Sequence, residues 1–142
     1  MKLERVLVPV DLSEPSRRAL AEAAALIAGR KSRLTVLHAH PIQQLTVLDF
    51  RYVEPPEKVL GYRDAAQRTL EQWVKELGLT DVELVVEMSD PVATIIEASK
   101  HHDLVVMGTH GRTGLEHFVL GSVAERVVRA AKCSVLIVRP SS

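Results

Sequence analysis

The sequence predicts an α/β fold, with an open sheet of five mainly parallel strands and helices on both faces. Short apolar runs alternate along the chain with segments of helical periodicity. Several runs are continuously apolar, which is typical of parallel strands buried on both faces. A length of 142 residues suits one domain with one core. We therefore expect a single domain, residues 1–142, with the element order βαβαβαβαβ and right-handed crossovers.

The chain begins with a strand, a helix and a second strand. Residues 5–10 (RVLVPV) predict a short buried strand that ends near Pro9, because proline lacks the N–H that a ladder needs. Ser13 is a suitable N-cap for a helix whose apolar face ends near Gly29. Residues 33–39 (RLTVLHA) are rich in β-branched and aliphatic side chains, which predicts the second strand.

The middle of the chain contains one segment without a clear pattern. Several prolines follow the second strand, and the conformation of residues 43–58 is not predicted. Apolar residues then recur near helical spacing over residues 59–77, which predicts a second helix with its apolar stripe, Leu60 included, in the core. Gly78 is a natural end for this helix. Residues 82–86 predict the third strand.

The remaining elements have clear boundaries. Asp90 is a suitable N-cap, followed by Pro91 at the first position of a short third helix. Residues 104–107 predict the fourth strand, and a fourth helix opens at Val123 after a loop that contains glycines. Residues 135–138 (VLIV) predict the last strand.

Charge and aromatic content exclude one class of function. Lysine plus arginine number 18 and aspartate plus glutamate also number 18, so the formal net charge is zero. A nucleic-acid-binding domain usually carries a basic excess, and its bases stack on aromatic side chains, which make up only 4% of this chain. We expect no nucleic-acid partner.

The sequence also gives an expectation for the compartment. The first residues run directly into the first strand without the pattern of a signal peptide, and no apolar window is long enough for a membrane span. A single cysteine, Cys133, cannot form an internal disulfide. We expect a cytoplasmic protein without a membrane partner.

A loop with glycines at a regular spacing is the strongest functional signal. Gly108, Gly111, Gly121 and Ser122 lie between the fourth strand and the fourth helix. Glycines let the backbone approach an anion, and the N–H groups and dipole of the next helix point at its charge. The spacing matches neither a Walker loop nor a dinucleotide fingerprint. Asp11 and Ala39 also follow strand ends, which in a parallel sheet gather at the ligand-binding edge.

Two segments of the chain are distinctive when taken together: VLVPVDLSEPS (residues 6–16) and VVMGTHGRTGLEHFVLGSVAERVVRAAKCSVLIVR (residues 105–139). With them the chain resembles the universal stress protein family, and the match extends over essentially its whole length. The glycines fit the pattern G-x2-G-x9-G-[ST], which marks the ATP-binding branch of that family. The resemblance implies a Rossmann-like sheet with the strand order 3-2-1-4-5, and ATP as the ligand with Mg²⁺ bridging its phosphates.

The resemblance also assigns roles to residues. The phosphates and ribose would contact the glycines, Ser122 and the amide of Val123, whereas Asp11 would meet the nucleoside and two residues would flank the base. His110 and Arg112 are weaker candidates for phosphate contact. The full expected set is Pro9, Val10, Asp11, Ala39, Met107, Gly108, His110, Gly111, Arg112, Gly121, Ser122 and Val123. No catalytic residue and no protein metal ligand is expected.

A homodimer is the partner that the resemblance implies. Family members often pair edge to edge through the last strand, here Ser134–Val138. An exposed edge strand with β-branched residues has unpaired backbone groups that favour aggregation. Pairing with a second copy across a twofold axis satisfies those groups. Ser89 and Ser134 depart from the common family pattern, where glycine and proline are frequent, but neither belongs to the expected nucleotide site. The regulated protein partner is not identified.

Several residues also have a purely structural interpretation. Ser122 and Glu125 form a capping-box pattern, so Ser122 could be only a helix cap. Asp11 could be a turn residue before the Ser13 cap. His38 is expected as a polar residue at a strand end and Cys133 as a small packed residue.

Three functions remain open from the sequence. The first is a regulatory stress-response module that binds ATP, with ADP or AMP as unresolved competitors. The second is a slow ATPase or phosphotransfer enzyme, for which only Arg112 and Asp11 are available to stabilise charge and hold Mg²⁺. The third is a dimeric adaptor that binds no nucleotide, against which the glycine pattern argues. A phosphoacceptor receiver domain is excluded, since the acidic pair and the lysine that it needs are missing.

Overall fold

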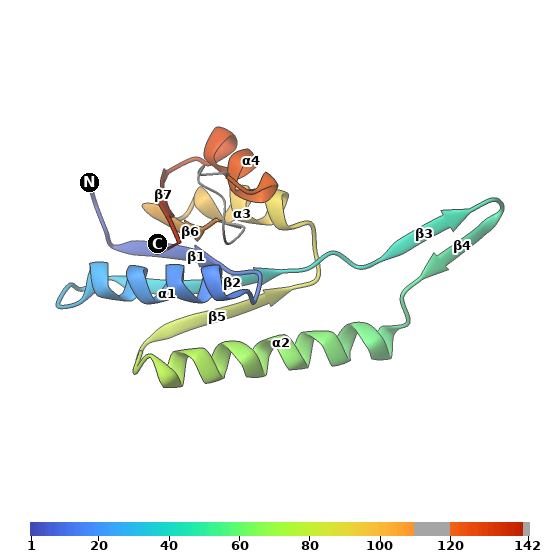
Figure 1. Cartoon of the computed structure of the whole chain (residues 1–142), viewed down its shortest axis with the longest axis horizontal. Coiled ribbons are helices and arrows are strands. Elements are labelled where there is room, and N and C mark those ends of the chain that lie inside the picture. The colour runs from blue at the N-terminus through green and yellow to red at the C-terminus, as the bar shows by residue number, and fades with distance from the viewer. Residues whose placement is uncertain (110–119, 141–142) are drawn as a thin grey trace.

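The central sheet consists of five parallel strands in a computed structural model that describes residues 1–109 and 120–140 (Figure 1). The strands are β1 (Arg5–Pro9), β2 (Arg33–Ala39), β5 (Val82–Glu87), β6 (Leu104–Gly108) and β7 (Ser134–Val138). They are hydrogen-bonded in the order β5-β2-β1-β6-β7, and all four pairings are parallel. The α/β fold expected from the sequence is confirmed.

The labels differ from the expected order 3-2-1-4-5 because a separate hairpin adds two strands to the count. When the strands of the main sheet are numbered by themselves, β5 is the third, β6 the fourth and β7 the fifth, and the two orders agree. β1 lies at the centre, flanked by β2 and β6. The order of the strands therefore changes direction beside β1, which is the place where parallel sheets bind ligands.

Four helices cover the two faces of the sheet. They are α1 (Glu14–Ile27), α2 (Pro56–Glu76), α3 (Pro91–Ser99) and α4 (Ser122–Ala130). Figure 1 shows α1 and α2 on one face and α3 and α4 on the other. One core cluster joins the first pair to the even-numbered side chains of β1, such as Val6 and Val8, and the other joins the second pair to Leu7. The period-2 alternation of β1 thus contributes to both cores.

Two of the four helices, α1 and α3, begin at the expected positions, whereas the start of α4 is corrected by one residue. Ser13 caps α1 by accepting a hydrogen bond from Ser16 N, and Asp90 caps α3 by accepting one from Ala93 N at 2.9 Å. α4 begins at Ser122 rather than at Val123. Its N-cap is Gly121, with φ −62° and ψ 157°, so the interpretation of Ser122 as the cap is wrong by one residue.

The region without a predicted conformation contains a β-hairpin. β3 (Gln44–Val47) and β4 (Phe50–Val53) pair antiparallel around a turn in which Leu48 has φ 56°. All eight strand residues are exposed, and the hairpin projects away from the body of the molecule (Figure 1). It is a protruding arm between β2 and α2.

The second helix is longer than expected, and its first turns leave the core. α2 begins at Pro56 instead of residue 59. Ala66, Leu70 and Trp73 are buried against the sheet, whereas Leu60 is 55% exposed, so its expected core position is wrong. Figure 1 gives the reason: the N-terminal turns of α2 extend beyond the strands toward the arm.

Candidate functional site

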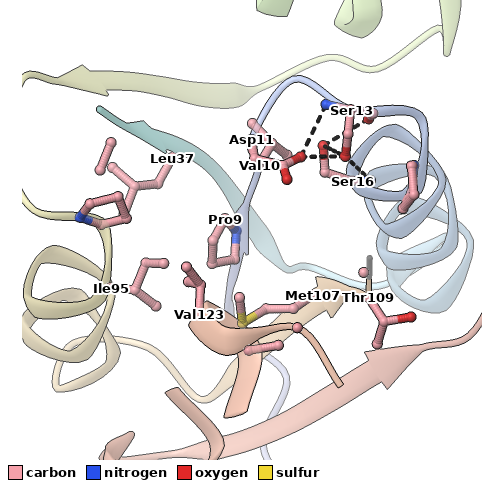
Figure 2. Close-up of a pocket in the computed structure, with 16 residues that line it drawn as sticks. Pro9, Val10, Asp11, Ser13, Ser16, Leu37, Ile95, Met107, Thr109 and Val123 are labelled. Carbon is pink, nitrogen blue, oxygen red and sulfur yellow. Dashed lines mark hydrogen bonds between the residues drawn. The ribbon is translucent and has the colours of Figure 1, made fainter. Parts of the chain in front are cut away.

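A pocket lies at the carboxyl ends of the central strands, where four segments of the predicted site meet. Its cavity volume is about 140 Å³. Figure 2 shows Pro9, Val10 and Asp11 from the end of β1 facing Met107 from β6 and Val123 from α4. The predicted residues that line it are Pro9, Val10, Asp11, Ala39, Met107, Gly108, Gly121 and Val123. The fold therefore gathers eight of the twelve predicted residues.

The other four predicted residues are not part of this lining. Ser122 is exposed on the first turn of α4 and does not line the pocket. His110, Gly111 and Arg112 lie outside the described residues. Their expected contacts with phosphate stay predictions.

Sequence reasoning missed a second group of lining residues. These are Ser13, Pro15, Ser16, Leu37, Pro91, Ile95, Thr109 and Ala124. Two signals could have found most of them. In a parallel sheet with crossover helices, the helix that follows a strand begins at the carboxyl end of that strand. Ser13 and Pro91 were already identified as helix starts, so their places beside the pocket follow from the topology.

The turn after β1 fixes Asp11 against the start of α1. Asp11 Oδ1 accepts a hydrogen bond from Ser13 N at 3.0 Å and a second from Ser13 Oγ. Leu12, between them, has φ 66°, a left-handed conformation that costs energy for a leucine. The structural role expected for Asp11 as a turn residue is present, and the same residue also lines the pocket (Figure 2).

Three helix N-termini point toward the pocket, and one differs from the others. Ser13 at α1, Pro91 at α3 and Gly121 at α4 all line it. α1 and α3 have side-chain caps, whereas no side chain caps the N-terminus of α4 among the described residues. The first N–H groups of a helix and its dipole attract anions. The start of α4 is thus the place in this pocket best suited to a phosphate.

The opposite wall of the pocket is apolar. Pro9, Leu37, Ala39, Ile95 and Met107 supply it, and all but Ala39 are buried. An apolar wall facing a few polar groups is the usual composition of a small-molecule site. This combination suits a ligand with a flat apolar part and an anionic part.

Gly108 is a glycine because of packing. A Cβ atom built on it would lie 2.5 Å from Pro15 O and 2.8 Å from Pro15 C, distances that real Cβ atoms do not reach. The missing side chain lets the start of α1 approach the end of β6. Access of an anion to the backbone, the reason expected from the sequence, stays a prediction.

His38 holds the backbone of Val10, one of the residues that line the pocket. It is only 3% exposed, and its Nδ1 lies 2.8 Å from Val10 O while its Nε2 lies 2.8 Å from the Tyr62 hydroxyl. Val10 N also donates to Leu37 O at 2.8 Å, so both backbone groups of Val10 are held by β2. The residue expected only at a strand end is a buried link between α2 and the end of β1.

Burial lowers the pKa of His38 below its ordinary value of 6.5, and the nearby His40 lowers it further. The hydrogen bond with Val10 and the charge of Asp11 act in the opposite direction on the same pKa. The neutral ring is therefore the favoured form in the folded protein. With Nδ1 donating to the carbonyl of Val10, Nε2 accepts from the hydroxyl of Tyr62.

One buried polar atom in the pocket wall lacks a partner. Thr109 is 1% exposed, and its Oγ1 makes no hydrogen bond with the rest of the described chain. Thr109 follows β6 directly, at the start of the glycine-containing loop. An unsatisfied buried hydroxyl costs roughly 1–3 kcal/mol, and such atoms concentrate at functional sites.

Residues 1–109 and 120–140 lack two features. They contain no group of three or more histidine, cysteine, aspartate or glutamate side chains placed to hold a metal ion. No helix in these ranges is long and apolar enough to cross a membrane.

The chain is similar to known proteins over nearly its whole length. A family model described as "Universal stress protein family" matches residues 2–139. A Staphylococcus haemolyticus protein named as universal stress protein SH1215 is 29% identical over 147 aligned positions, which cover 96% of this chain and 84% of that protein.

Two solved structures share the fold. Universal stress protein UspA from Lactobacillus plantarum has a TM-score of 0.77 at 23% identity, and the match covers 98% of this chain and 99% of that one. A universal stress protein crystallised in complex with cAMP has a TM-score of 0.67 at 26% identity, with 99% and 100% covered.

Proposed function

The chain belongs to the universal stress protein family, and from that premise we propose that it is a regulatory module that binds ATP in the pocket at the end of β1. The single observation that carries the proposal is the uncapped N-terminus of α4 facing an apolar wall across the pocket. The adenine would lie against Leu37, Ala39 and Met107. The phosphates would lie at Gly121 and the first amides of α4, together with Gly108, Gly111 and Ser122.

Two further observations support an adenine nucleotide. The complex with cAMP shows that a relative of 26% identity accepts one. The pocket also places a carboxylate, Asp11, between the apolar wall and the start of α1, where it can accept a hydrogen bond from a sugar hydroxyl.

Mg²⁺ would be held mainly by the phosphates. Asp11 is the only carboxylate that lines the pocket in the described part of the chain, and a cage of protein ligands needs several. Magnesium typically keeps waters and binds through substrate phosphates with one or two carboxylates. The donor set therefore fits a metal that arrives with the nucleotide.

The pocket can be tested by filling it. Ala39→Leu adds a side chain to the apolar wall, and Ala28→Leu, on the exposed end of α1, is the matched control. Equilibrium dialysis with ATP, ADP, AMP and cAMP would measure the affinities of both variants. We expect Ala39→Leu alone to weaken every adenine nucleotide by about tenfold or more. Equal affinities in the two variants would place the nucleotide elsewhere, and absence of binding to the unmodified protein would refute the proposal.

We propose also that the protein forms a homodimer through β7. This strand is at one edge of the sheet and pairs only with β6 within the described chain. Its Leu136 is 41% exposed. A second copy related by a twofold axis would pair with this open edge.

A further inference from the structure

At the opposite edge of the sheet from β7, a groove runs between β5 and α3, and Leu37 is the one lining residue that it shares with the nucleotide pocket. Its volume is about 490 Å³. Leu7, Leu37 and Val85 of the sheet and Ala98 of α3 give it an apolar floor. Of these, Leu7 and Leu37 are buried below the surface.

The rim of the groove is acidic. Glu83 and Glu87 of β5 and Glu97 of α3 line it, as do His101 and His102, which follow α3. Glu97 is paired with Lys100 at 2.7 Å. The carboxylates of Glu83 and Glu87 make no ion pair or hydrogen bond with the described part of the chain, so the side of the groove formed by β5 carries two unbalanced negative charges.

The strand beside the groove has an open edge. β5 is the terminal strand of the sheet and pairs only with β2 among the described strands. Glu87 O accepts a hydrogen bond from His40 N on the β2 side. Because successive residues of a strand direct their backbone groups to opposite sides, Leu84 and Val86 direct theirs to the open edge. An added strand would find unpaired donors and acceptors there.

The charge of the rim decides which occupant fits. A second copy that used the same face across a twofold axis would bring Glu83 and Glu87 against themselves, and like charges at close range oppose association. A partner with positive side chains would instead gain from both carboxylates. This argument selects a basic partner that is not another copy of the chain.

The alternation of side chains along β5 predicts the sequence pattern of that partner. Glu83, Val85 and Glu87 lie on the groove face, whereas Leu84 and Val86 lie on the other face. The two carboxylates are four residues apart, roughly 13 Å along the strand. A strand that pairs with β5 would direct every second side chain to the groove face. Basic residues at the positions that face the groove would contact the two carboxylates. The aliphatic residues would alternate with them in the sequence of the added strand.

We propose that the open edge of β5 and its acidic groove bind an extended protein segment in which basic and aliphatic residues alternate. The segment adds to the sheet as a further strand. Main-chain hydrogen bonds hold it to Leu84 and Val86, and its basic side chains contact Glu83 and Glu87. This surface would be the docking site for a partner protein, and it does not depend on the nucleotide.

A direct test uses a labelled peptide of sequence RVRVRV and fluorescence anisotropy with the full-length protein. The variant Glu83→Lys/Glu87→Lys reverses the charge of the rim on two exposed positions. The variant Glu4→Lys/Glu22→Lys makes the same change in net charge on other exposed positions. We expect saturable binding that weakens with salt, is about tenfold weaker for the rim variant, and is unchanged for the control.

Two matched peptides separate strand addition from simple charge attraction. RRRVVV has the same composition without alternation, and RVRVRV with every backbone amide nitrogen methylated cannot donate a main-chain hydrogen bond from either edge. Both should bind at least about tenfold more weakly than RVRVRV. Equal binding of RRRVVV would mean an acidic surface only and would overturn the proposal. So would absence of binding, or equal binding to the rim variant.

Discussion

Gly108 shows how a single residue sets the distance between a strand and a helix. Its Cα is so close to the Pro15 carbonyl that any Cβ would displace the start of α1. Gly61, in the first half of α2, has open space where a Cβ would lie and no left-handed φ. The two glycines therefore have opposite expected responses to the same substitution.

We predict that Gly108→Ala lowers the free energy of unfolding by about 1–3 kcal/mol, the usual cost of forcing an extra group into a packed site. Gly61→Ala should raise it by roughly 0.5–1 kcal/mol, since alanine loses less chain entropy in a helix. Urea unfolding followed by circular dichroism measures both. A neutral Gly108→Ala would contradict the packing explanation.

His38 gives a prediction for pH dependence. Burial lowers the pKa of its ring in the folded state below the ordinary 6.5, so the unfolded chain binds the proton more readily. The stability that the neutral ring contributes is present above pH 6.5 and is lost as the pH falls through 6.5 toward the lower pKa of the folded state.

The free energy of unfolding should therefore decrease between about pH 7 and pH 5 more steeply in the unmodified protein than in His38→Gln. Glutamine keeps polar atoms at the site but does not titrate. Parallel urea titrations of both proteins at each pH give the comparison. Identical slopes would show that His38 is not the titrating group.

At the scale of elements, the arm formed by β3 and β4 has two different faces. Cross-strand pairs place Leu45 beside Tyr52 and Val47 beside Phe50 on one face. These four side chains are 48–79% exposed. A two-stranded hairpin without a packed face is marginal in water, so the arm contributes little to the stability of the domain.

We predict that Phe50→Ser changes the free energy of unfolding by no more than about 0.5 kcal/mol, because Phe50 is already 79% exposed. Trp73→Ala, in the buried half of α2, should cost about 3–5 kcal/mol. Chemical unfolding of both variants tests the contrast. A large loss in Phe50→Ser would show that the arm packs against something.

The same contrast explains what the sequence could and could not predict. Elements with a buried side, such as β1 and α3, have a clear apolar period and a recognisable cap, and their bounds agree with the structure within a residue or two. The arm has no buried side, so its residues carry no signal of burial. Leu60 was misplaced because periodicity indicates which face of a helix is apolar but not where the sheet beneath it ends.

Some residues of the candidate site could likewise be predicted from the sequence, and others could not. Pro9, Asp11 and Ala39 could be predicted because each follows a strand, and topology brings strand ends together. The packing role of Gly108 and the link through His38 depend on contacts between residues 24 to 93 positions apart, which no local pattern contains.

At the scale of the whole molecule, the two edges of the sheet differ in chemistry. The β5 edge is lined by Glu83 and Glu87, whereas β7 carries no charged residue in Ser134–Val138. An uncharged edge tolerates a second copy and an acidic edge opposes one. Self-association through β7 and partner binding at β5 can therefore coexist.

We predict that Leu136→Lys weakens the homodimer by about tenfold or more, because it places like charges together across the twofold axis. Val128→Lys, at a similarly exposed position on α4, is the matched control and should leave the dimer intact. Sedimentation equilibrium gives both dissociation constants. Equal values in the two variants would exclude β7 as the interface.

The central claim is that the start of α4 binds the phosphates of ATP, and isothermal calorimetry of ATP with and without Mg²⁺ tests it most directly. Gly121→Val places a side chain at the N-cap, where φ −62° and ψ 157° accept a valine without backbone strain, and Gly61→Ala is the control. The account predicts micromolar binding that Gly121→Val loses and Gly61→Ala keeps. Absence of heat for the unmodified protein after removal of any copurified nucleotide, or equal binding by Gly121→Val, would contradict it.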